Sequence, residues 1–265
     1  MKQLLFFTLS LTLFSSCKDD AINKKNNLNT IEHPKKEVTL INNKADLIIN
    51  KAIEAHGGKL FTNANYSFEF RNKKYQFKHS NDEFLYTLNF LNPEKKTVVD
   101  SLYNGKFNRH IDGQLAELSD KNISKYSEAI NSVMYFTLLP YKLNDKSVHK
   151  KIIGTETINN EDYDLIEVTF SEEGGGTDHD DQFLYWINKK THNLDYLAYK
   201  YNVNGGGARF RSFYNRRVIG GITFQDYINW EGQTNVPLKS FSKQFEQNTL
   251  KELSRIETTQ IINLK

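Results

Sequence analysis

Residues 98–118, VVDSLYNGKFNRHIDGQLAEL, contain two dipeptides that reverse the chain, Asn104-Gly105 and Asp112-Gly113. Each lies between short segments in which apolar and polar residues are interleaved. Each also suits a type I′ turn, whose positive φ angles match the twist of paired strands. The stretch therefore predicts three strands joined as an antiparallel meander.

Outside this stretch, apolar and polar residues continue to alternate with the period of two that is typical of strands. This alternation predicts strands at residues 66–70, 75–77, 84–90, 152–157, 163–170, 183–187, 194–203, 210–218 and 222–230, and a last one at 255–264. Helical spacing predicts helices at residues 45–56, from a cap at Ser119 or Asp120 through Met134 and before Pro140, and in a short piece between 238 and 250. His56 is expected to end the first helix as an imidazolium that interacts with the helix dipole.

The strands from Phe183 to Tyr201 are apolar on both faces. In an antiparallel sheet with one face exposed to solvent, hydrophobic and polar residues instead alternate along each strand. Both faces are therefore predicted to be covered, one by helices and the other by the inside of a curved sheet. The predicted fold is mainly β: a curved antiparallel meander, or unclosed β-barrel, with two or three helices packed on its concave face. The candidates for lining a ligand groove are Trp186, Leu184, Tyr196, Tyr199, Tyr201 and Phe210.

The N-terminus has the layout of a lipoprotein signal. A short basic start precedes an apolar run, Leu4 to Phe14, which is about half the roughly 20 residues that a spanning helix needs. Cys17 follows small residues and is the sole cysteine, so a disulfide within the chain is excluded. We expect a signal peptide at residues 1–16, an acylated Cys17, a flexible tether through residue 44, and one domain at 45–265.

Composition and net charge limit the classes of partner that we expect. The formal net charge is +3, and no basic stripe is interleaved with aromatic residues, so a nucleic-acid partner is not expected. Hydrophobic residues make up 38% of the chain, which is enough to build a substantial core. The expected partners are the outer membrane, through the lipid anchor, and a lipid or lipidated protein.

Two resemblances add to these expectations. Lys18-Asp19-Asp20 resembles the export signal of Bacteroidota surface lipoproteins, one residue earlier than usual, which implies the outer membrane and its outer face. The combination of a helix ending in His56-Gly57-Gly58, a long meander and Trp186 resembles the Lol-type lipoprotein-sorting factors, which are unclosed barrels with an apolar cavity for acyl chains.

A closer resemblance is to an uncharacterised family of flavobacterial lipoproteins. It is carried by residues 54–60 (EAHGGKL), 139–143 (LPYKL), 173–176 (EGGG) and 209–211 (RFR). That family has no established activity. The resemblance therefore implies a fold and no catalytic residues.

The densest polar cluster is the loop Glu172–Asp181, which is rich in glycine and carboxylates. Carboxylate oxygens at close spacing are ligands for a hard cation such as Ca²⁺, and a pair of acids with His179 would also suit a hydrolase. The third interpretation is a solvated hairpin loop, and the sequence favours this one. The candidate metal ligands are Glu173, Asp178, Asp180 and Asp181. No cofactor is otherwise expected.

Arg209 and Arg211 follow three glycines and share one strand face, so together they could bind a carboxylate or phosphate. Two solvent-facing arginines, or arginines paired with the acids of the Glu172–Asp181 loop, are the alternatives. The favoured function is non-enzymatic binding of an apolar or amphipathic ligand in the curved sheet. The alternatives are a surface hydrolase and a cation-dependent module that binds glycan or protein.

Overall fold

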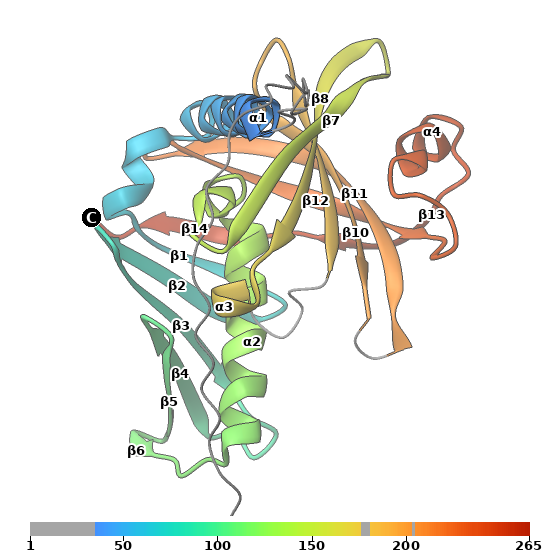
Figure 1. Cartoon of the computed structure of the whole chain (residues 1–265). Coiled ribbons are helices and arrows are strands. Elements are labelled where there is room, and N and C mark those ends of the chain that lie inside the picture. The colour runs from blue at the N-terminus through green and yellow to red at the C-terminus, as the bar shows by residue number, and fades with distance from the viewer. Residues whose placement is uncertain (1–34, 176–180, 203–204) are drawn as a thin grey trace, which may run out of the picture. The chain divides into compact units, whose positions relative to one another are not determined.

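The computed structural model describes residues 35–175, 181–202 and 205–265, and the predicted signal peptide and Cys17 lie outside these residues. Two antiparallel sheets dominate this part of the chain (Figure 1). Sheet A has the order β14-β1-β2-β3-β4-β5-β6, and sheet B has the order β13-β12-β11-β10-β9-β8-β7. The strands at the two ends of each sheet do not pair with each other, which confirms the predicted unclosed, mainly β fold.

The elements have the following bounds. Sheet A contains β1 (Asn65–Phe70), β2 (Lys73–Ser80), β3 (Glu83–Leu91), β4 (Thr97–Tyr103), β5 (Lys106–Ile111), β6 (Gln114–Leu115) and β14 (Thr259–Asn263). Sheet B contains β7 (Val148–Ile158), β8 (Glu161–Phe170), β9 (Gln182–Asn188), β10 (Leu194–Tyr201), β11 (Gly207–Ile219), β12 (Ile222–Gly232) and β13 (Lys251–Ile256). The helices are α1 (Lys35–Ala55), α2 (Asp120–Thr137), α3 (Glu172–Gly175) and α4 (Ser240–Glu246), with two short 3-10 helices, η1 (Gly58–Asn63) and η2 (Tyr141–Asn144).

The two predicted turns set the register of sheet A. Asn104 and Gly105 have φ of 46° and 85°, and Asp112 and Gly113 have φ of 49° and 81°. These positive angles are those of the predicted type I′ turns. The turn at Asn104-Gly105 pairs Tyr103 with Lys106. Neighbouring strands of the meander follow one another along the chain from β1 to β6.

Helix α1 begins at Lys35, so residues 35–44, predicted as the end of a flexible tether, are helical. The buried face of α1 carries Ala45, Ile49 and Ala52, which pack against the inner face of sheet B. The helix ends before Gly57, whose φ of 131° favours glycine. The folded unit therefore runs from Lys35 to Lys265.

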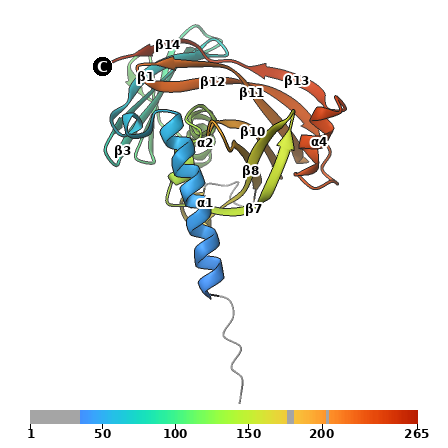
Figure 2. The same cartoon turned by 90° about the horizontal axis from the view of Figure 1, so that it is seen from above.

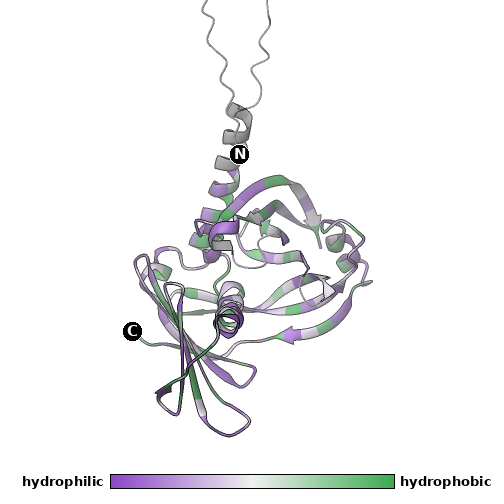
Figure 3. Cartoon of the chain, turned by 60° about the horizontal axis from the view of Figure 1, so that its bottom comes forward, coloured by the Kyte–Doolittle hydropathy of each residue, from purple (hydrophilic) through white to green (hydrophobic). Residues whose placement is uncertain are grey.

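Helix α2 packs against both sheets. Ile130 and Met134 are fully buried on its sheet A side, and Tyr135 and Phe136 pack with residues of sheet B on its other side. Figures 2 and 3 show strands of both sheets arranged around α2. Figure 3 also shows hydrophilic and hydrophobic residues alternating along strands, as one-sided burial requires.

The outer face of sheet B is covered by the segment that contains α4. Leu238 and Phe241 from this segment pack with Trp186, Leu184 and Phe210 in one buried cluster. This confirms that the strands from Phe183 are covered on both faces. Helices α1 and α2 pack on the inner side, which agrees with the prediction of two or three helices there, and α4 lies on the opposite face of sheet B.

The predicted last strand, residues 255–264, is two strands. β13 ends at Ile256 and pairs with β12, and β14 begins at Thr259 and pairs with β1. The C-terminal segment thus passes from sheet B to sheet A. Within the described residues, we find no helix with the length and apolarity needed to cross a bilayer.

His56 is fully buried beyond the end of α1, and its Nδ1 lies 2.7 Å from the Ala52 carbonyl oxygen. Burial lowers the pKa of the imidazole to about 4, although the hydrogen bond to Ala52 opposes this shift. The imidazole is therefore neutral at pH 7, and the predicted imidazolium is wrong. The side chain supports the junction between α1 and β12, where the Thr223 amide donates to the His56 carbonyl.

We expect the free energy of unfolding to decrease as the pH falls from about 6.5 to about 4. The unfolded imidazole takes up a proton near pH 6.5 and the folded one only near pH 4, so acid favours the unfolded chain. The limiting loss from this residue is on the order of 3 kcal/mol. Urea unfolding at pH 7 and pH 5 tests this. His56→Gln should lose less stability over this interval than the natural chain or the control His110→Gln, and an equal loss in all three would contradict it.

Candidate functional site

A pocket of about 730 Å³ lies between α2, the inner face of sheet B and one end of strands β3 and β4 of sheet A, with the turn after β4. We call it the inter-sheet pocket. Helix α2 contributes Ser127, Glu128, Asn131, Ser132, Tyr135 and Phe136 to its lining. Sheet B contributes Val148, Phe170, Phe183, Tyr199, Tyr201, Arg209 and Arg211, and Asp181 and Ser147 lie beside these strands. Sheet A contributes Phe84 and Leu102, with Asn104 and Gly105 from the turn after β4.

One wall of this pocket is aromatic. The rings of Phe183 and Tyr199 stack with centroids 5.2 Å apart, and Phe170 meets Phe183 edge-on at 5.5 Å. Tyr135 lies edge-on to Phe170, and Phe136 lies 5.7 Å from Tyr199. We call these five side chains the aromatic wall. Ring pairs at such separations are favourable, and together they offer an apolar surface to a guest.

Two hydrogen bonds hold α2 against sheet B behind this wall. The hydroxyl groups of Tyr135 and Tyr185 lie 2.6 Å apart, and the Tyr227 hydroxyl donates to the Phe136 carbonyl oxygen. Burial raises the pKa of the Tyr185 hydroxyl well above its usual value, so it stays neutral. The aromatic wall is therefore fixed by the packing and polar contacts of two elements.

Arg211 is the buried cation of the pocket, with 7% of its surface exposed. Its guanidinium lies 3.8 Å from the ring centroid of Phe136, and its Nη2 donates to Tyr199 Oη at 2.7 Å. Arg209 is half-buried two residues away on the same strand, and its guanidinium lies 5.2 Å from the ring of Tyr201. Two cations thus line the pocket from one face of β11.

The structure divides the predicted ligand-lining residues between the two faces of sheet B. Tyr199 and Tyr201 line the inter-sheet pocket. Trp186, Leu184, Tyr196 and Phe210 do not line it, because they point to the opposite face and pack under the α4 segment. Alternation showed that both faces are apolar. It gave no signal that a short helix covers one face and the pocket borders the other.

The predicted acidic site is only partly within the described residues. Asp178 and Asp180 lie outside them, Glu173 is exposed in α3, and Asp181 is 6% exposed. In the chain segments that the structure describes, no three His, Cys, Asp or Glu side chains are placed to hold a metal ion. Asp181 lines the inter-sheet pocket together with Arg209 and Arg211, so one acid of the loop and both arginines are brought to one place. The Ca²⁺ site remains a prediction.

Sequence reasoning missed the residues that α2 and β8 contribute, Tyr135, Phe136 and Phe170. The aromatic pair Tyr135-Phe136 at the end of α2 was a usable signal. Successive positions on a helix point in different directions, so apolar residues that directly follow Met134 indicate a second packing surface on the helix. Tyr135 and Phe136 are both partly buried against sheet B, whereas Met134 faces sheet A.

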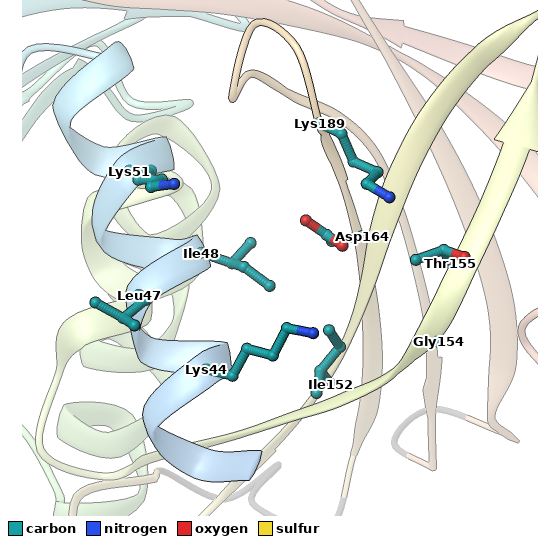
Figure 4. A pocket seen from close by; sticks show the side chains of 9 residues that line it. All are labelled: Lys44, Leu47, Ile48, Lys51, Ile152, Gly154, Thr155, Asp164 and Lys189. Carbon is teal, nitrogen blue, oxygen red and sulfur yellow. The ribbon is translucent and has the colours of Figure 1, made fainter. Parts of the chain in front are cut away.

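A second hollow of about 590 Å³ lies between α1 and strands β7 and β8 (Figure 4). Its lining includes three exposed lysines, Lys44, Lys51 and Lys189, around Asp164. Leu47 and Ile48 from α1 form its apolar side. This hollow lacks a buried ring cluster or a buried charge, so the inter-sheet pocket is the better candidate for a ligand site.

Residues 36–258 match the model of DUF6503, a family of unknown function. The chain belongs to this family. The match covers all four sequence segments on which the resemblance to an uncharacterised lipoprotein family was based, and it confirms that resemblance. No curated protein matches the chain.

Three of the solved structures to which the chain is similar are as follows. A LolA superfamily protein from Nitrosomonas europaea is 13% identical, with a TM-score of 0.47, and the match covers 83% of this chain and 93% of that one. A domain described as outer membrane lipoprotein-sorting, from Vibrio parahaemolyticus, is 10% identical with a TM-score of 0.43, over 77% and 99% of the two chains. The lipoprotein LppX of Mycobacterium tuberculosis is 11% identical with a TM-score of 0.28, over 77% and 100%.

Proposed function

We propose that this protein binds the apolar part of an amphipathic ligand, an acyl chain or a lipidated partner, in the inter-sheet pocket, and that it does so without catalysis. The observation that carries the proposal is the aromatic wall, which borders a cavity of about 730 Å³. Ligand pockets in proteins have volumes of roughly 300–1,000 Å³ and are mostly apolar with a few polar groups. The inter-sheet pocket has such a volume and exposes more apolar than polar surface, although many of its lining side chains are polar or charged.

The energetics support an acyl chain. Each methylene group that leaves water contributes about 0.8 kcal/mol, so a chain of several methylenes against these rings suffices for useful affinity. The described residues of the lining include no histidine, the side chain that most often acts as a general base and that activates a serine nucleophile. Binding therefore fits the pocket better than catalysis.

The proposed place of action is the outer membrane, with the domain held at the surface by an acylated Cys17. This part of the proposal is supported by the sequence of residues 1–20. We expect cells that express the natural chain to incorporate labelled palmitate into the protein, and the Cys17→Ser chain to incorporate none. Equal labelling of the two chains would contradict the anchor.

The binding proposal is tested with N-phenyl-1-naphthylamine, a neutral apolar probe whose fluorescence rises when it enters an apolar site. The natural chain should bind this probe. Ser132→Trp places a large side chain in the lining of the pocket and should weaken binding about tenfold or more, because the volume is occupied.

Ala129→Trp is the matched control, since Ala129 is an exposed position of α2 that does not line the pocket. It should leave the affinity unchanged. The proposal is wrong if the natural chain does not bind the probe, or if both variants bind it as the natural chain does.

A further inference from the structure

Arg211 has more donors than the described structure uses. A guanidinium carries five N–H donors and no acceptor. In the described residues, its side chain makes one hydrogen bond, from Nη2 to Tyr199 Oη at 2.7 Å. Its Nε is buried and has no hydrogen-bond partner there. Such an arrangement is unfavourable unless a ligand or another acceptor completes it, because a buried donor without a partner costs about 1–3 kcal/mol.

The aromatic rings around Arg211 explain how the charge is held but leave these donors unpaired. Phe136, Tyr199 and Tyr227 have ring centroids 3.8, 5.1 and 5.5 Å from the guanidinium carbon. A ring face stabilises a cation electrostatically, whereas the N–H groups of the guanidinium lie in its own plane. Arg211 is thus fixed in position beside the aromatic wall, and its Nε donor has no hydrogen-bond partner in the described residues.

The other charged side chains that line the pocket have different surroundings from those of Arg211. Lys142 pairs with Asp145 through a salt bridge, and both line the pocket. Glu128 accepts a hydrogen bond from Ser124 on exposed helix surface. Arg209 and Asp181 line the pocket as well. Arg211 differs from all of these because it combines nearly complete burial with contact to three rings.

We propose that the inter-sheet pocket selects amphiphiles with an anionic head, whose carboxylate or phosphate oxygen accepts hydrogen bonds from Arg211. The apolar chain then lies on the aromatic wall next to it. Arg209, on the same face of β11, adds a second positive charge. Guanidinium binds carboxylate and phosphate through parallel hydrogen bonds, so either head group is suitable. This inference rests on the proposed function and specifies its class of ligand.

Displacement of N-phenyl-1-naphthylamine from the full chain tests the selection. Dodecanoate and dodecyl phosphate should displace the neutral probe at concentrations at least about tenfold lower than dodecanol, which has the same chain and no charge. Acetate and inorganic phosphate, which have the charge and no chain, should not displace it at those concentrations.

The variant Arg211→Gln should reduce the preference for dodecanoate over dodecanol to about twofold or less, and Arg211→Lys should keep part of it, because the charge remains. Arg255→Gln is the control: its guanidinium is exposed and pairs with Glu252 outside the pocket, so the preference should not change. If Arg211→Gln does not fold, the comparison of head groups on the natural chain and on Arg211→Lys still decides the question.

The outcomes separate the two proposals. Equal displacement by dodecanol and dodecanoate overturns the inference and leaves apolar binding in place. A preference that survives in Arg211→Gln overturns the assignment to Arg211. Displacement by phosphate alone points to a free anion as the ligand and also overturns it. A natural chain that fails to bind the neutral probe removes the proposed function as well.

Discussion

Trp186→Ala is expected to lower the free energy of unfolding by about 3–5 kcal/mol. Trp186 is fully buried between the outer face of sheet B and the α4 segment. Its ring meets Phe210 edge-on with centroids 5.6 Å apart. Removing the indole leaves a cavity among rings that are fixed by their own packing, so the site cannot collapse fully.

The substitution also removes a hydrogen bond. Trp186 Nε1 donates to Glu156 Oε2 at 2.8 Å, and Ser242 Oγ donates to the same oxygen at 2.8 Å. The carboxylate thus joins β9 to α4, and in the variant it keeps only the contact from α4. Because Leu238 and Phe241 lose the indole against which they pack, we expect the α4 segment to loosen first.

Chemical denaturation measures the loss, and Tyr103→Ala is the control, since the 45% exposed Tyr103 should change stability by less than about 1 kcal/mol. The milder Trp186→Phe should remain folded and bind N-phenyl-1-naphthylamine with the natural affinity, because Trp186 faces away from the inter-sheet pocket. Weaker binding by Trp186→Phe would show that the guest lies on the α4 side of the sheet.

Asp226→Ala is expected to cost about 3–5 kcal/mol, the range for breaking a buried ion pair by removing one partner. Asp226 is 2% exposed and accepts hydrogen bonds from both terminal nitrogens of Arg217, each at 3.0 Å. The Thr258 amide donates to it at 3.0 Å and Asn215 Nδ2 at 2.7 Å. Alanine would leave Arg217 partly buried without its counter-charge.

The position of Thr258 means that Asp226→Ala should affect the local stability of β14 as well as the free energy of unfolding of the whole fold. Thr258 lies between β13 and β14, where the chain passes from sheet B to sheet A. Hydrogen exchange should therefore show the amides of β14 exchanging faster in Asp226→Ala than in the natural chain.

Glu252→Ala is the matched control, because it removes an ion pair with Arg255 whose two side chains are 38% and 55% exposed. Exposed pairs contribute roughly 0–1 kcal/mol. If Asp226→Ala and Glu252→Ala had equal effects, the buried junction would not stabilise the fold.

The sequence was informative where local chemistry decides structure. Asn104-Gly105 and Asp112-Gly113 favour positive φ, and the alternation that flanks them specifies which face is buried, so the meander of sheet A from β1 to β6 could be predicted. Residues 255–264 were harder: they have strand character throughout, and the change of partner sheet after Ile256 depends on the buried contact between Asp226 and Thr258.

The candidate site could be predicted only in part. Tyr199, Tyr201, Arg209 and Arg211 belong to neighbouring strands, and their common face follows from the period of two. That Phe136 packs on Arg211 depends on the distance between α2 and sheet B, which no local pattern encodes. For the same reason Trp186 was a ligand-lining candidate: its neighbours along the strand do not reveal that α4 covers it.

The unequal coverage of the two sheets has a consequence for the tolerance of the sequence to change. Outward positions of sheet A such as Lys74 and Lys78 face water, whereas residues on either side of the central strands of sheet B meet other side chains. Mutational drift within the family should therefore concentrate on the wet side of sheet A. Substitution in the middle of sheet B should be confined to side chains of similar volume.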